Sequence, residues 1–424
     1  MPASPFTATQ ERLPRHEPNL ATNISRNPRP HPGRHGPARM GDLWHGPLSL
    51  CLKCGLQNTH HSPLLMAWHG ILGHDDVAQQ FRQAIGRGRL ASSFLFVGPA
   101  GVGKLTFAVK LGQSLLCLQR PEAALDPCEC CPSCLQVAAG THPDLEIVSK
   151  PEEKSYLPLE LFIGDKEHRM KEGLCRKIAL RPFLGGRKIA IIDDADFLNA
   201  EGANCLLKTL EEPPPQSLLI LIGTSPAKQL PTIRSRCQLI RFRPLRTEQV
   251  EELLLSRGLV AEPSEAQRLA AASEGSLQRA MELADVELWD FRDKLQQRLA
   301  EPQMDGVGLA KTVMALVEEA GKEASAKRRR MQQIARFTAD FYRAVLRHRC
   351  GAAETDDGHP SDALAAALRS WPGDAEMAAA CLERTLDAAD EIQRNVHPAT
   401  LVECWLHDLT RITLPAASKR RSRI

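Results

Sequence analysis

A glycine-rich segment at residues 98–104, GPAGVGK, has the composition of a phosphate-binding loop. It matches the first seven positions of the pattern G-x-x-x-x-G-K-[ST] and directly follows an apolar run. Glycines let backbone N–H groups point inward around phosphates, and the lysine neutralises the β- and γ-phosphate oxygens. We therefore predict a nucleotide site at Gly98, Gly101, Gly103 and Lys104.

The eighth position of this loop departs from the pattern. Leu105 stands where a serine or threonine hydroxyl would ligate Mg²⁺, and leucine has no lone pair to offer. Thr106 follows, but successive side chains on a helix point about 100° apart, so its hydroxyl cannot replace a ligand at position 105. We predict weak or absent ATP hydrolysis. Whether ATP and Mg²⁺ bind at all is left open, the alternative being a loop that keeps its shape without nucleotide.

Two aspartates follow the apolar run IAII at residues 189–192. A buried strand there would deliver them to its carboxyl end, where α/β sheets bind their ligands. Asp193 is predicted to hold water on the metal, and Asp194 to polarise the attacking water. Active ATPases of this class usually carry a longer glutamate at the second position, so Asp194 is a further departure.

Cysteines at four positions have the spacing of metal ligands. The pattern is C-x10-C-x2-C-x2-C, formed by Cys117, Cys128, Cys131 and Cys134. Four thiolates close a tetrahedral structural zinc site, which leaves no open position for catalysis. Cys130 is a surplus thiol that could replace Cys128 or Cys131. The alternative interpretation is a group of free thiols or a redox pair.

Apolar runs place these residues on an α/β domain. A helical pattern at 77–90 leads to FLFV at 94–97, and the runs at 189–192 and 218–222 are separated by helical stretches. This order is typical of a parallel sheet covered by helices. After Pro244 the pattern is helical, with breaks near 302–308 and 351–362. The predicted divisions are an α/β domain (66–243, zinc module 117–134), a helical lid (244–300), an all-helical C-terminal domain (301–414) and a basic tail (415–424).

Charge is unevenly distributed along the chain. The net charge is +3, but the basic surplus is concentrated at the two ends and the part between is slightly acidic. Autonomous DNA binding normally requires a basic face, so any DNA contact should be shared with partners. No apolar stretch reaches eighteen residues and no secretory signal is present. We expect a cytoplasmic protein without a membrane segment.

Residues 1–65 hold ten of the thirty prolines and lack sustained apolar periodicity. We predict a disordered extension, which could even reflect an incorrectly assigned start. Cys51, Cys54, His60 and His61 offer zinc-binding residue types in loose spacing, and we favour an unstructured tail over a metal site there.

Two further segments carry a family resemblance. They are ANCLLKTLEEPP at 203–214 and LPTIRSRC at 230–237. Both resemble bacterial clamp-loader subunits of the AAA+ type, the delta-prime and gamma/tau group. The similarity is dense over 66–245 and thinner through the lid. In the C-terminal domain it depends mainly on NVHP at 395–398 and the helix after it.

The resemblance implies specific roles. Arg236 matches the family's arginine that reaches into the ATP site of a neighbouring subunit, a role suited to a planar and permanently charged guanidinium. The alternative is an arginine that closes a loop through a surface ion pair. Thr224 or Ser225 falls where the family places a polar nucleotide sensor. The family also has a zinc module at the same place, and a C-terminal collar domain for oligomerisation.

The lid segment EGSLQRA at 274–280 distinguishes the two types within the group. Active gamma-type subunits carry an arginine three residues after this glycine, and here that position is Gln278. Arg279 is adjacent but should face another direction on a helix. Two ATP-contacting positions are therefore altered while Arg236 is retained, which favours a delta-prime type.

We therefore expect a subunit that assists ATP-driven loading of a sliding clamp onto primed DNA. The implied partners are gamma/tau and delta subunits, the clamp, and DNA through the complex. The family is classed with the DNA polymerase III holoenzyme, a DNA-directed DNA polymerase and nucleotidyltransferase, but the chain has no polymerase site. The alternatives are a gamma/tau-type subunit that hydrolyses ATP itself and a zinc-dependent DNA-binding regulator.

Overall fold

The computed structural model describes residues 68–414, except 170, 185, 352–361 and 395. The predicted extension at 1–65, with its loose cysteine and histidine group, lies outside the described residues. The basic tail at 415–424, most of the predicted break at 351–362 and Asn395 of the NVHP segment also lie outside them.

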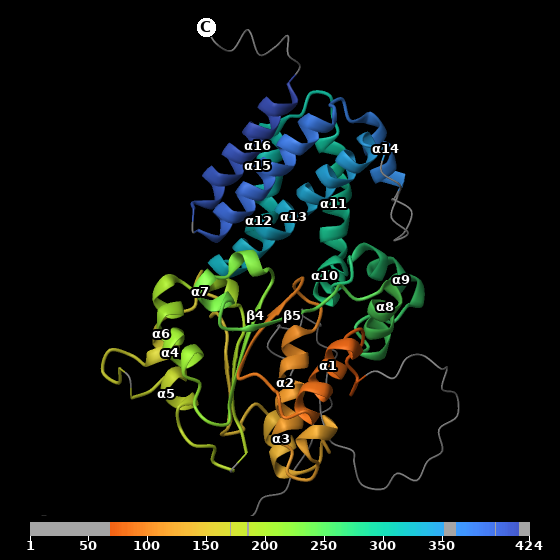
Figure 1. Ribbon diagram of the computed structural model, residues 1–424. Coiled ribbons are helices and arrows are strands. Elements are labelled where there is room, and N and C mark those ends of the chain that lie inside the picture. Colours follow the sequence, from red (N-terminus) through yellow and green to blue (C-terminus); the bar gives the residue numbers. More distant parts are fainter. Residues whose placement is uncertain (1–67, 170, 185, 352–361, 395, 415–424) are drawn as a thin grey trace, which may run out of the picture. The chain divides into compact units, whose positions relative to one another are not determined.

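Five parallel strands form one sheet in the order β2-β3-β4-β1-β5 (Figure 1). The central strands are apolar at nearly every position because helices cover both faces of the sheet. The predicted α/β fold with a parallel sheet is therefore confirmed. The strands are β1 (Ser93–Val97), β2 (Leu145–Val148), β3 (Lys188–Ile192), β4 (Ser217–Gly223) and β5 (Gln238–Arg241).

Alternate residues of each central strand enter two different cores. In β1, Phe94 and Phe96 pack with the helices of the first face, whereas Leu95 and Val97 pack with those of the second. The first face is covered by α1 (Asp75–Gly86) and α2 (Lys104–Leu115), with α3 (Pro132–Ala138) beyond α2. The second face is covered by α4 (Glu160–Ile163), α5 (Leu174–Ile178), α6 (Ala200–Glu211) and α7 (Pro231–Arg234).

Three of these strands, β1, β3 and β4, coincide with the apolar runs identified in the sequence. The edge strands β2 and β5 were missed. Each has only four residues, and in β5 only Ile240 is buried. An edge strand with one covered face does not produce a continuous apolar run, so its sequence signal is weak.

Beyond Phe242, which belongs to the sheet core, the chain is helical. Leu245 already belongs to a third hydrophobic cluster, which continues through the lid helices to Leu409. A division between lid and collar at residue 300 stays a prediction, because this one cluster contains both. The helices are α8 (Thr247–Ser256), α9 (Pro263–Ala272), α10 (Leu277–Leu283), α11 (Val286–Leu299), α12 (Gly306–Glu319), α13 (Ala324–Arg349), α14 (Asp362–Ser370), α15 (Ala375–Gln393) and α16 (Pro398–Thr413).

Among the described helices, none combines the length and apolarity that crossing a membrane would need. Even α13, which has 26 residues, carries a basic run near its start and three basic residues in its last turn.

Candidate nucleotide and metal sites

The phosphate-loop pattern forms a tight turn between β1 and α2. Gly103 has φ +94°, a conformation that side chains rarely adopt, and it directly precedes the first residue of α2, Lys104. At Gly98 a Cβ would come within 2.3 Å of the Phe242 carbonyl oxygen, so only glycine fits there. The glycine spacing is thus explained by backbone geometry at the end of β1.

Lys104 is held by the loop itself. Its Nζ donates hydrogen bonds to the carbonyl oxygens of Gly98, at 2.8 Å, and Pro99, at 2.5 Å. Burial lowers the pKa of Lys104, although the charges of Asp193 and its two acidic neighbours act in the opposite direction. The ammonium therefore lies between the loop carbonyls and an acidic group, the arrangement from which it would meet a phosphate.

Neither residue after Lys104 supplies the hydroxyl expected at a Mg²⁺ site. Leu105 is partly buried and packs against the core of the first sheet face. Thr106, one residue later, is exposed. The structure therefore places an apolar side chain where the pattern requires an oxygen ligand.

Asp193 and Asp194 follow β3 at the carboxyl edge of the sheet. Burial, with a contribution from the charge of Asp194, raises the pKa of Asp193 to about 6. Burial also raises the pKa of Asp194, and this residue adopts a left-handed backbone conformation with φ +57°. The two predicted acids and Lys104 lie at the same edge of the sheet, and the charges of both acids act on the pKa of Lys104.

A third acid, Asp196, organises the neighbouring strand end and was not predicted. It accepts hydrogen bonds from the backbone N–H and the hydroxyl of Thr224, and from Gln229 Nε2 at 2.7 Å. Ser225 instead accepts a hydrogen bond from the Ala227 N–H, at 3.2 Å. Of the two sensor candidates, Thr224 is thus the one connected to the acidic group. The spacing of 28 residues gave no sequence signal for this pair.

The lid contacts the phosphate loop through the start of α10. The Leu277 N–H donates to the Gly101 carbonyl at 3.1 Å, and a Cβ at Gly101 would lie 2.4 Å from Ser276 Oγ. Gln278 hydrogen-bonds to Glu282, at 3.1 Å. At the position where active gamma-type subunits carry arginine, this chain therefore offers a neutral amide.

Arg279 lies in a different environment. It is buried, and it pairs with Glu274 at 2.8 Å and with Asp340 of α13. The expectation that Arg279 faces away from the position of Gln278 is confirmed.

Arg236 lies just after α7 and is one-third exposed. Its Nε and Nη2 donate to Glu211 Oε1, at 3.0 and 2.6 Å. Its Nη1 donates to the Thr232 carbonyl, at 3.0 Å, and to Ser235 Oγ, at 3.1 Å. The guanidinium thus lies at the surface, where it forms an ion pair with Glu211 of the same chain.

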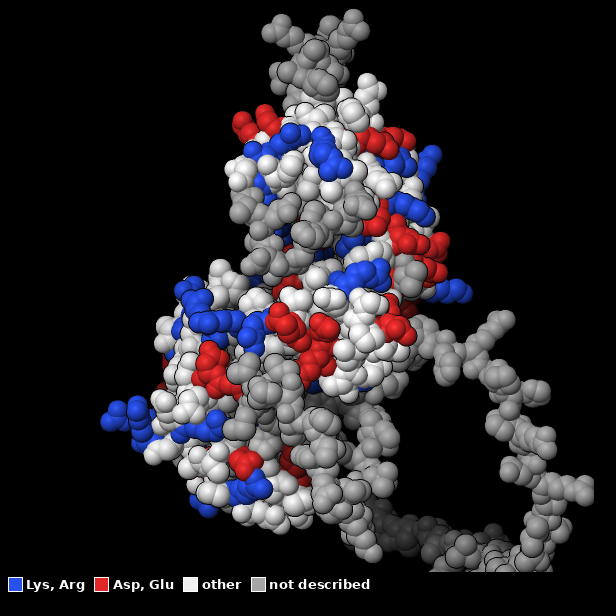
Figure 2. All heavy atoms as spheres, turned by 90° about the vertical axis from the view of Figure 1, so that its right-hand side faces the viewer, with Lys and Arg blue, Asp and Glu red and all other residues white. Residues whose placement is uncertain are grey.

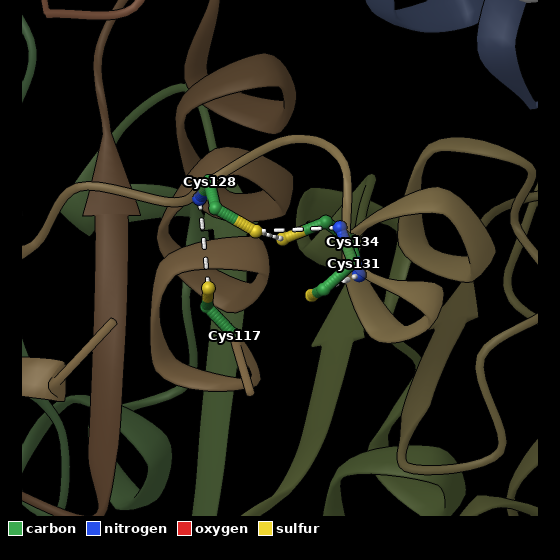
Figure 3. Close-up of side chains that lie close together, drawn as sticks. All are labelled: Cys117, Cys128, Cys131 and Cys134. Atoms are coloured by element: carbon green, nitrogen blue, oxygen red, sulfur yellow. Dashed lines mark hydrogen bonds between the residues drawn. The ribbon is translucent and has the colours of Figure 1, made fainter. Parts of the chain in front are cut away.

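The structure brings the four predicted metal ligands together (Figure 3). The sulfur atoms of Cys117, Cys128, Cys131 and Cys134 lie within 4.8 Å of one another. Backbone N–H groups point at three of them: Cys128 N to Cys117 Sγ, Cys131 N to Cys128 Sγ, and Cys134 N to Cys131 Sγ. Cys130 is exposed and directed toward Gln119, so it is not a member of this group.

The donor set fits a tetrahedral zinc ion. Zn–S distances of about 2.3 Å place the sulfurs of such a site roughly 3.8 Å apart, and the Sγ atoms of Cys128 and Cys134 are 3.9 Å apart. Burial acts against ionisation, yet hydrogen bonds from the N–H groups of Cys130 and Cys131 lower the pKa of Cys128 to about 6. Burial raises the pKa of Cys134, so a bound cation would be needed to ionise all four thiols.

Fold and site together define an α/β domain with a parallel sheet, a phosphate-loop turn after β1, and a four-cysteine module. The family described as "DNA polymerase III, delta subunit" matches residues 73–246. Over this segment the chain is similar to clamp-loader subunits of the delta-prime and gamma/tau group.

The sequence relatives include both delta' and tau subunits. DNA polymerase III subunit delta' of Pseudomonas aeruginosa is 40% identical over 45% of this chain and 55% of that protein. The subunit of the same name from Bacillus subtilis is 34% identical over 47% of this chain and 56% of that protein. DNA polymerase III subunit tau of Escherichia coli is 31% identical over 51% of this chain and 32% of that protein. The chain thus spans about half the length of the delta' relatives.

Purified protein should contain about one zinc ion per chain, because four thiolates in this arrangement bind Zn²⁺ strongly. Replacing Cys131 and Cys134 together by serine should remove the metal and destabilise residues 117–134 while leaving the sheet intact. Elemental analysis measures the zinc, and hydrogen exchange localises the destabilisation. Cys130→Ser is the matched control and should keep the metal. A folded, metal-free wild-type protein would contradict the prediction.

Asp193→Asn should stabilise the protein at neutral pH. A carboxyl whose folded pKa is raised from 3.8 to about 6 destabilises the fold once it must ionise. This penalty is absent below pH 4 and complete above pH 6, and a shift of this size corresponds to about 1 to 3 kcal/mol. Urea unfolding of both proteins at pH 5 and pH 8 tests it. The increase in the free energy of unfolding should be larger at pH 8 than at pH 5. Equal increases at both pH values would rule out ionisation of Asp193 as the cause.

Proposed function

We propose that this protein is a delta-prime-type subunit of the DNA polymerase III clamp loader, acting in the cytoplasm with gamma/tau and delta subunits to place a sliding clamp on primed DNA. One contrast supports the proposal most. The residues needed for the chain's own ATP chemistry are altered, whereas Arg236, the residue suited to a neighbour's ATP site, is present at the surface. The family match and the delta' relatives agree with this assignment.

In this proposal the subunit's own nucleotide site is weak for two independent reasons. Leu105 removes one oxygen ligand of Mg²⁺. Gln278 cannot supply positive charge to a γ-phosphate, and Arg279 is committed to Glu274 and Asp340. The zinc module then serves as a structural element, and the AAA+ fold serves as a partner surface rather than as a motor.

A catalytic gamma/tau-type function is the second candidate, since tau relatives match a similar length of this chain. The retained phosphate loop and Lys104 favour it. Leu105 and Gln278 argue against it, because both positions act on the metal or the γ-phosphate of the same nucleotide.

A zinc-dependent DNA-binding regulator is less well supported. Figure 2 shows basic and acidic side chains interspersed over the face drawn, without a continuous basic surface. In the basic run at the start of α13, Lys327 pairs with Glu318 and Arg330 with Asp285. These ion pairs agree with a solvated helix face better than with a DNA-reading surface.

The isolated chain should show little ATP turnover, and Leu105→Thr should restore nucleotide binding only in part, because Gln278 remains. Steady-state ATPase and equilibrium nucleotide binding are the measurements. Turnover comparable with that of a gamma-type subunit assayed in parallel would favour the gamma/tau alternative.

Arg236→Ala should reduce the clamp- and DNA-stimulated ATPase of the complex reconstituted with gamma/tau and delta subunits. Arginine fingers contribute on the order of 10³–10⁵ in rate, although several sites in one ring dilute the loss. Arg236→Lys should rescue poorly, because one ammonium cannot reproduce the paired donors of a guanidinium.

Zinc content, thermal melting and assembly of the Arg236→Ala protein should stay close to wild type, since an exposed ion pair contributes only about 0.2 to 1 kcal/mol. If such complexes hydrolyse ATP and load clamps at the unmodified rate, Arg236 does not act on a neighbouring site.

A further inference from the structure

Glu211 is the single acidic partner of Arg236 among the described residues. One carboxylate oxygen, Oε1, accepts from both Nε and Nη2 of the guanidinium. A guanidinium has five N–H donors, and the bonds to Glu211, Thr232 and Ser235 engage four of them. In the free subunit, Arg236 therefore has one N–H left for a group outside the chain.

The position of Glu211 indicates that it contributes through its ion pair with Arg236 and not by stabilising its own helix. It is the last residue of α6, where a carboxylate opposes the negative end of the helix dipole. Its adjacent acid, Glu212, is also exposed but makes no ion pair with a described residue. An acid that is unfavourable for its own helix gains its main favourable contact from Arg236.

This contact has a chemical consequence for a trans-acting arginine. To stabilise a γ-phosphate, a guanidinium offers two or more donors to the phosphate oxygens. Here those donors are already occupied, and the occupying group is itself an anion that would repel the phosphate. Productive engagement thus requires Arg236 to exchange Glu211 for the phosphate. Both side chains are partly exposed, so this exchange needs no unfolding.

We propose that Glu211 is a positioning residue that restrains Arg236 against its own chain until a neighbour's nucleotide competes for it. The restraint limits ATP hydrolysis in complexes that have not yet engaged clamp and DNA. This inference rests on the proposed trans role of Arg236. It adds a residue, Glu211, and a direction of effect that the trans role alone does not contain.

The helix that ends at Glu211 begins close in sequence to the acidic group after β3. α6 begins after Asn199, whose side chain accepts a hydrogen bond from the Gly202 N–H at 2.8 Å. Asn199 closely follows the acidic group that begins at Asp193. The same helix therefore runs from the segment that follows the acidic group to Glu211, which holds Arg236.

The test is Glu211→Gln in the reconstituted complex, with ATPase measured without and with clamp and primed DNA. The amide keeps the side chain's shape but removes the charge that opposes the phosphate. We expect the unstimulated rate to rise roughly two- to fivefold, the range set by the energy of a partly exposed ion pair. The stimulated rate should change less. A variant that merely damages the fold lowers both rates, so an increase separates the restraint from a structural role.

Two further variants make the result specific. Glu212→Gln removes the same charge one residue away and should leave both rates unchanged. Glu211→Gln combined with Arg236→Ala should behave like Arg236→Ala alone, because Glu211 acts only through Arg236.

The outcomes separate this inference from the proposed function. If Arg236→Ala lowers the stimulated rate but Glu211→Gln leaves the unstimulated rate unchanged or lower, the restraint is wrong and the trans role stands. An increase that persists in the double variant, or that Glu212→Gln reproduces, also overturns the restraint. If Arg236→Ala complexes keep the full rate, the proposed function fails first.

Discussion

The buried charge of Lys104 beside three aspartates is the constraint on which the nucleotide site depends. The carboxyl edge of a parallel sheet collects the ends of β1, β3 and β4, and so gathers one lysine with Asp193, Asp194 and Asp196. Burial disfavours charge on three of these residues: it lowers the pKa of Lys104, raises that of Asp193 to about 6, and raises that of Asp194. An additional polyanion would be accepted here only with a well-held divalent cation. Leu105 offers no oxygen ligand for that cation, which is one of the two reasons for the weak nucleotide site in the proposed function.

The four-cysteine module is attached to this sheet by a separate polar network. Ser133, between two of the cysteines, donates to the Leu116 carbonyl at 2.6 Å and lies 2.9 Å from His142 Nε2. The Asp144 N–H donates to His142 Nδ1 at 3.0 Å, so the imidazole carries its proton on Nε2 and donates to the serine. Asp144 in turn pairs with Lys188 at the start of β3, at 3.0 Å. The cysteines are thereby positioned by contacts that continue into the amino edge of the sheet, opposite the nucleotide site.

The sequence contained most of the information for residues whose roles depend on local spacing. The phosphate loop, the four cysteines and the three longest apolar strands could be predicted because each pattern lies within a short segment. The strands β2 and β5 could not, because a four-residue edge strand buries too few side chains to leave a clear periodicity. Pairings such as Asp196 with Thr224 and Glu211 with Arg236 join residues 28 and 25 positions apart. Only the folded packing of β4, α6 and α7 specifies them.

The lid shows how a shift of one residue changes the chemistry available to an arginine. On α10, Gln278 faces Glu282, whereas Arg279 turns toward Glu274 and Asp340 of α13. Burial raises the pKa of Asp340, while the charge of Arg279 opposes that rise, so each charge makes the burial of the other tolerable. Removing either partner would leave an uncompensated buried charge. This cost keeps the side chain of Arg279 in its ion pair with Asp340. The positive charge that a gamma-type lid would direct at nucleotide therefore serves here to join α10 to α13. In the proposed function, the partly exposed guanidinium of Arg236 supplies the charge that acts on a neighbour's phosphate.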